Sequence, residues 1–213
     1  MYRTDLKLIT FLPSGENFCQ GFSPDDFTAG RAYQLIEAFG RLFEQLQATS
    51  IPILSVIKGK AFGAGLELVT FSDLAIAAES STFRFPEVRI GLIPTIACNI
   101  LQKVIPYKRA TELILSGELI TAKEAETYGF INKAVPDDKL QEQAGLMVGK
   151  LLQSSAPVLQ CAKKAMIASQ DKTLSESLDA IEEIYLQQVL TLEDSKEGIQ
   201  AFIENRKPVW KNR

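Results

Sequence analysis

The stretch KGKAFGAGLE, residues 58–67, is the most informative part of the chain. It follows an apolar run at residues 52–58 that predicts a buried strand, and it leads into a predicted helix over residues 66–71. Its three glycines allow the main chain to approach a ligand closely. Unpaired N–H groups at the start of a helix favour negative charge. The stretch therefore predicts either an anion or oxyanion site or simply tight packing of a helix against a strand.

Two common phosphate-binding motifs do not fit this stretch. The pattern GxxxxGK[ST] is absent, and GxGxxG fails because Leu68 stands where the last glycine is required. The remaining functional interpretation is an oxyanion hole, which needs a second N–H donor from elsewhere in the chain.

Working outward from residues 58–67, predicted strands alternate with predicted helices. Apolar and β-branched runs predict further strands at residues 6–12, 74–78, 82–85 and 131–135, and helical spacing predicts helices at residues 31–48, 97–104, 110–115 and 121–129. The pattern is helical throughout after residue 138. This order predicts an α/β fold with a helical C-terminal region. Within residues 31–48, an apolar stripe predicts core contacts rather than a ligand surface: Phe39, Leu42, Phe43 and Leu46.

Composition limits the possible partners and compartments. The chain has 213 residues, of which 46% are hydrophobic and 23% are charged, and its net charge is −3. This balance is typical of a soluble globular protein and argues against nucleic acid as a partner. We expect no secretory signal and no membrane span, because no apolar run is long enough. Three widely spaced cysteines without a CxxC pair argue against zinc and disulfides, and predict a cytoplasmic protein.

The chain contains no histidine, so any acid–base chemistry depends on other side chains. Catalytic triads of the Ser-His-Asp type, Cys-His pairs and HExxH zinc sites are excluded. Glu67 and Glu87 are the leading candidates, although a single glutamate is more often a solvated charge. Cys98 and Cys161 are expected to pack in the interior. Lys58 and Lys60 fit phosphate contacts and plain surface charges equally well.

Four stretches together resemble the crotonase superfamily of enoyl-CoA hydratases and isomerases. These stretches are FCQG at residues 18–21, GAGLEL at 63–68, FPEVRIGLIP at 85–94, and residues 115–131, which begin LSG and end GFI. The resemblance runs from about residue 6 to residue 208. It implies a crotonase-like spiral of ββα units over residues 1–150, without the first N-terminal ββα unit. Residues 151–213 would form a C-terminal helical region that mediates a trimer or hexamer.

The resemblance also implies how the site works. The crotonase fold binds an acyl-CoA thioester and holds its carbonyl oxygen with two main-chain N–H groups, which here match Cys19 and Ala64. Glu67 and Glu87 match the two glutamates of the hydratases, which hold one water between them. Glu67 would orient and deprotonate that water, and Glu87 would exchange the proton at the α-carbon. Further substrate-binding positions would be Phe18, Gly21, Gly63 and Thr95.

Hydration of an enoyl-CoA, with CoA as part of the substrate and without a metal or redox cofactor, is the function that this resemblance implies. The isomerases of the family often work with only the second glutamate, so the presence of Glu67 favours the hydratase. Double-bond isomerisation and a non-catalytic acyl-CoA-binding scaffold remain alternatives. Residues 95–101 (TIACNIL) replace the glycine-rich tract of ordinary hydratases and look more like the run in cyclic dienoyl-CoA hydratases.

Overall fold

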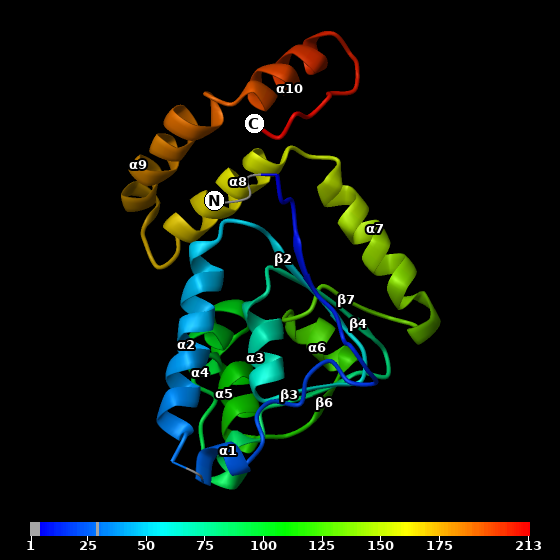
Figure 1. Ribbon diagram of the computed structural model, residues 1–213, viewed down its shortest axis with the longest axis vertical. Coiled ribbons are helices and arrows are strands. Elements are labelled where there is room, and N and C mark those ends of the chain that lie inside the picture. The colour runs from blue at the N-terminus through cyan, green and yellow to red at the C-terminus, as the bar shows by residue number, and fades with distance from the viewer. Residues whose placement is uncertain (1–4, 29) are drawn as a thin grey trace. The chain divides into compact units, whose positions relative to one another are not determined.

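The computed structural model describes residues 5–28 and 30–213, which divide into two compact units (Figure 1). The core unit comprises Thr10–Ala48 and Ile53–Gly145. The helical unit comprises residues 5–9, Thr49–Pro52 and Leu146–Arg213. The boundary between residues 145 and 146 lies five residues before the predicted one at 150/151. The sequence pattern did not predict that residues 5–9 and Thr49–Pro52 would group with the C-terminal helices.

The main sheet has four strands in the order β1-β2-β4-β7. The bounds are Ile9–Phe11 for β1, Ile53–Ile57 for β2, Leu74–Ala78 for β4 and Lys133–Val135 for β7. β2, β4 and β7 run parallel, with Val56 opposite Ile76 and Ala77 opposite Ala134. Every residue of β2 is buried, as expected for a parallel strand covered on both faces. This sheet confirms the predicted α/β class.

A second, three-stranded sheet was not predicted. It consists of β3 (Lys60–Phe62), β5 (Thr82–Arg84) and β6 (Ile120–Thr121) in the order β3-β5-β6. β3 pairs parallel with β5, and β5 pairs antiparallel with β6. β3 and β6 contain only three and two residues, too few to show a period-2 pattern.

Apart from the short helix α1, which was not predicted, the helices of the core unit follow the predicted order. Their bounds are Asp25–Thr28 for α1, Ala32–Ala48 for α2, Ala64–Phe71 for α3, Ala97–Val104 for α4, Tyr107–Ser116 for α5 and Ala122–Tyr128 for α6. α2 lies beside α3 (Figure 1). Phe39 and Phe43 of α2 form a hydrophobic cluster with Ala64, Leu68 and Phe71 of α3. A capping box begins α6: Thr121 accepts from the Glu124 N–H, and the Glu124 carboxylate accepts from the Thr121 N–H. Short 3₁₀ turns, η1 (Glu87–Ile90) and η2 (Asp137–Lys139), complete the unit.

α7 (Leu140–Leu152) leads into the helical unit. This unit contains α8 (Ala156–Ala168), α9 (Leu174–Ile184), the π-helical turn η3 (Tyr185–Val189) and α10 (Glu193–Ile203). The buried Asp194 carboxylate accepts from the N–H groups of Lys211 and Asn212, so α10 holds the C-terminal segment. Of the helices described, none is both long and apolar enough to span a membrane.

Candidate active site

Glu67 lies in the first turn of α3 and is almost completely buried, with 3% of its surface exposed. Gly63 precedes the helix at φ +52°, a conformation that favours glycine, and brings the chain from β3 into α3. Oε1 of Glu67 accepts from the N–H groups of Ile96 at 2.6 Å and Ala97 at 2.8 Å. These are unpaired donors at the start of α4, so the carboxylate holds that helix as well as facing the interior.

Three effects set the proton affinity of Glu67. Burial raises its pKa from 4.5 to about 7, and the negative charge of Glu87 adds to the rise. The hydrogen bonds from Ala97 and Ile96 stabilise the ionised form and limit the rise. The carboxyl group therefore exchanges its proton near neutral pH, in a chain that has no histidine to do so.

Glu87 opens the turn η1, which is fixed by side-chain contacts to the end of α5. Arg89, on the same turn, donates through Nε to the Ser116 carbonyl at 2.8 Å. Burial raises the pKa of Glu87, and the hydrogen bond from its own N–H opposes that effect. Its Oε2 is buried, and in the described part of the chain it has no hydrogen-bond partner. A buried polar atom without a partner calls for an explanation, and a bound substrate or water would supply one.

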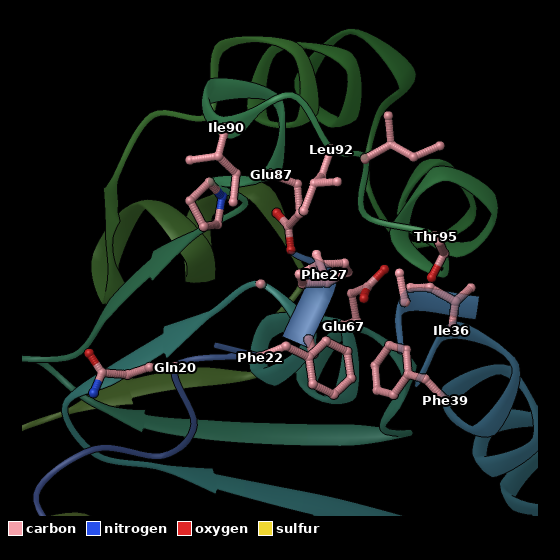
Figure 2. Close-up of a pocket in the computed structure, with 16 residues that line it drawn as sticks. Gln20, Phe22, Phe27, Ile36, Phe39, Glu67, Glu87, Ile90, Leu92 and Thr95 are labelled. Carbon is pink, nitrogen blue, oxygen red and sulfur yellow. The ribbon is translucent and has the colours of Figure 1, made fainter. Parts of the chain in front are cut away.

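The two glutamates line one cavity of about 270 Å³. Figure 2 shows both carboxyl groups facing this space, Glu67 from α3 and Glu87 from η1. The remaining wall is mainly apolar and comes chiefly from residues 20–22, α1, α2 and residues 90–95. It includes Phe22, Phe27, Ile36, Phe39, Ile90, Leu92 and Ile93. A small apolar cavity with two convergent carboxyl groups of raised pKa is typical of an active site.

Ala64 provides a main-chain N–H at the edge of this cavity. As the first residue of α3, it belongs to the turn whose N–H groups have no partner within the helix. Gly21 passes so closely that a Cβ there would lie 3.3 Å from the Ala64 nitrogen and 3.2 Å from the Phe62 carbonyl oxygen. Gly21 also has φ +85°, so both the space and the conformation require glycine.

Cys19 does not fulfil the prediction of an oxyanion donor. Its N–H donates to the Lys60 carbonyl at 3.2 Å, and its carbonyl accepts from Phe62, so the residue is paired in a parallel bridge with Ala61. The amide that follows Gly21 fits better. Phe22 lines the cavity, and its N–H has no acceptor among the described residues. The signal in the sequence was Gly21 just before it, because glycine readily adopts a positive φ, which is +85° here, and such a turn redirects the next N–H.

The predicted substrate-binding residues lie partly in the cavity and partly in the hydrophobic core. Gly21, Gly63 and Thr95 line the cavity, whereas Phe18 does not and packs against the main hydrophobic core. The prediction that the stripe on α2 is only core was wrong for Phe39, which is buried and also lines the cavity. Leu42, from the same stripe, is 40% exposed.

Two of the cysteines and the possible metal ligands were also compared with the predictions. Cys98 is exposed and Cys161 is partly buried, so the expected interior packing was wrong for Cys98. Within residues 5–28 and 30–213, no group of three histidine, cysteine, aspartate or glutamate side chains is arranged to hold a metal ion.

Comparison with known proteins identifies similar chains. The family model described as enoyl-CoA hydratase/isomerase matches residues 3–213. The mitochondrial enoyl-CoA hydratase domain-containing protein 3 of Rattus norvegicus is 32% identical over 97% of this chain and 70% of its own. The 2,3-dehydroadipyl-CoA hydratase of Escherichia coli is 33% identical over 81% of this chain and 68% of its own. The crystal structure of human enoyl-CoA hydratase domain-containing protein 3 has a TM-score of 0.91 at 29% identity, covering 98% of this chain and 83% of that one.

These comparisons correct the predicted cytoplasmic location. The similar proteins of rat, frog, human and Dictyostelium discoideum are all named mitochondrial. The cysteine pattern on which the prediction rested reports a reducing environment, which does not distinguish between such compartments.

Proposed function

Because this chain belongs to the enoyl-CoA hydratase/isomerase family and has its crotonase-like fold, we propose that it adds water reversibly to an α,β-unsaturated acyl-CoA. The observation that carries this proposal is that Glu67 and Glu87 line one cavity. The names of the Escherichia coli hydratase and of the Salmonella typhi carnitinyl-CoA dehydratase, 31% identical, support chemistry in which water is added or removed.

The thioester carbonyl is held by main-chain amides in this proposal. The N–H groups of Ala64 and Phe22 both border the cavity and have no acceptor within the described chain. Two such donors polarise the carbonyl and stabilise the enolate that forms when water adds at the β-carbon. One donor of this kind contributes ~3 kcal/mol to transition-state stabilisation. The reaction draws only on main-chain amides and carboxyl groups, and CoA enters as part of the substrate.

The two carboxyl groups divide the proton transfers between them. Ionised Glu67, fixed by the Ile96 and Ala97 amides, orients the water and takes its proton. Glu87 in its protonated form delivers a proton to the α-carbon, which its raised pKa favours. The opposite proton transfers return the enoyl thioester, so the same pair serves the dehydration.

An assay in water enriched in heavy oxygen tests the proposal. Incubation with a short enoyl-CoA should consume the conjugated thioester and yield 3-hydroxyacyl-CoA that carries the heavy oxygen, as measured by mass spectrometry. A shift of the double bond without incorporated oxygen would indicate an isomerase instead. Binding of acyl-CoA without any turnover would indicate a non-catalytic scaffold. Either result would overturn the proposed hydration.

A further inference from the structure

The wall of the cavity, apart from its two glutamates, carries no charge. Of the described residues that line it, none is a lysine or an arginine. The polar side chains other than the glutamates are those of Gln20 and Thr95. Arg31, which directly precedes the lining residue Ala32 in sequence, is exposed and does not line the cavity. A negatively charged group entering this space would therefore meet no positive side chain.

The aromatic part of the wall is braced from behind. The ring of Phe39 meets Phe22 edge to face at 4.9 Å between centroids, and Phe22 meets Phe27 in the same manner at 6.3 Å. Phe39 in turn packs on Phe43 at 4.9 Å, and Phe43 packs on Phe71 at 5.0 Å. Rings that interlock in this way resist displacement. The phenylalanine side of the wall therefore resists displacement, whereas Ile36, Ile90 and Ile93 line the cavity with 37%, 57% and 65% of their surfaces exposed.

Electrostatics and desolvation both favour an apolar acyl group over one that ends in a carboxylate. An apolar tail gains from leaving water for the phenylalanine and isoleucine wall. A tail that ends in a carboxylate loses its hydration, finds no partner and is repelled by the ionised glutamate in the same cavity. The proposed reaction itself needs that glutamate to be ionised.

We propose that this site selects acyl groups that are uncharged and apolar beyond the reacting carbons, and that it rejects acyl groups with a terminal carboxylate. The inference rests on the proposed function, because it assumes that the cavity receives the acyl part of the thioester. It separates this chain from its Escherichia coli relative, whose name states a dehydroadipyl-CoA substrate, an acyl group that ends in a free carboxylate.

A pair of substrates of equal length tests the inference. The kcat/KM of the wild-type chain should be at least ~100-fold higher for 2-hexenoyl-CoA than for 2,3-dehydroadipyl-CoA, because a charge against an apolar wall without a positive partner is strongly rejected. Equal kcat/KM values for the two substrates would overturn the inference.

Ile36 offers a variant that should weaken the selection. This residue lines the cavity from α2, yet it is 37% exposed, so a charged end can reach solvent and the fold is kept. Ile36→Lys should reduce the preference for the uncharged substrate at least ~10-fold, since it supplies a counter-charge. Ile36→Met, of similar length but without charge, should keep the wild-type ratio. Equal ratios in the two variants would contradict the electrostatic explanation.

Binding measurements separate this inference from the proposed function. Hexanoyl-CoA and adipoyl-CoA lack the double bond, so their affinities, measured by calorimetry, do not depend on catalysis. If the chain hydrates neither enoyl substrate but binds hexanoyl-CoA at least ~10-fold more tightly, the proposed function fails and the selection stands. If the chain hydrates both substrates equally well, the function stands and the selection fails. If it binds neither thioester, both are wrong.

Discussion

Two features of the Glu67 environment change its pKa in opposite directions. Its Oε1 holds the Ile96 and Ala97 amides, which favours the ionised form. Its burial favours the neutral form and has the larger effect, because the pKa rises to about 7. A carboxyl group balanced in this way can give and take a proton near neutral pH, which a solvated glutamate cannot do efficiently.

This balance has a measurable consequence for stability. A folded-state pKa above the unfolded value means that the folded chain binds the proton more tightly, so the stabilisation is complete below pH 4.5 and is lost as pH rises through about 7. The free energy of unfolding should therefore fall by about 2.5 kcal/mol between pH 5 and pH 8 through this group. Urea unfolding at several pH values measures the fall.

The matched variant for this prediction is Glu67→Gln, which keeps an oxygen for the two amides but cannot ionise. Its unfolding free energy should fall by less than that of the wild type over the same pH range, and the remaining fall comes from Glu87, whose pKa is also raised by burial. Glu118→Gln removes a carboxylate at an exposed position and should leave the wild-type pH dependence intact. A wild-type stability that rises steadily from pH 5 to pH 8 would show that Glu67 is not the buried, proton-retaining group described here.

At the scale of elements, the junction from β3 to α3 builds most of the site. Within a few residues it turns the chain, exposes the Ala64 amide and aims Glu67 into the cavity. Its glycines are required by close contacts. A Cβ on Gly65 would lie 2.3 Å from the Cys19 carbonyl oxygen, and one on Gly63 would lie 2.7 Å from Oε1 of Glu87. The junction therefore fits against Cys19 and against Glu87 of η1 only without side chains at these positions.

Gly63→Ala should lower kcat/KM at least ~10-fold, because the new methyl group displaces the Glu87 carboxyl group, and small displacements in an active site are costly. It should also cost about 1–3 kcal/mol of stability, since φ is positive at this position. Gly129→Ala is the control: this glycine also has positive φ, at the end of α6, but nothing lies within 4 Å of its Cβ position. Rates per folded molecule should be near wild type for Gly129→Ala, and wild-type rates for Gly63→Ala would contradict the described fit.

At the scale of the whole molecule, the sequence predicted what depends on local pattern. Apolar runs located β2 and β4, and helical spacing located α2, α4 and the helices after residue 138. The two glutamates, Ala64 and the glycines around the cavity were also identified, through the glycine-rich junction and the resemblance to crotonases. These features can be recognised because each is encoded in a continuous stretch of residues.

The features that were missed depend on contacts between distant residues. Cys19 was taken for a free donor because its pairing with Lys60 and Ala61 joins segments that are about 40 residues apart. Phe39 was predicted to be a core residue only, because it has the sequence spacing of a core residue. In the structure it is buried and also lines the cavity. The hydrogen bonds from the start of α4 to Glu67 could not be predicted from any local sequence pattern, because the donors lie 29 and 30 residues away in the chain.

The central claim is that Glu67 and Glu87 act on one water in one cavity, and a double-mutant cycle on hydration tests it most directly. Glu67→Gln and Glu87→Gln should each lower kcat for enoyl-CoA hydration about 100- to 10,000-fold. The double variant should be no more than ~3-fold slower than the slower single variant, because groups that act as a unit lose their effect together. Penalties that multiply in the double variant, or a single variant with wild-type kcat, would contradict the claim.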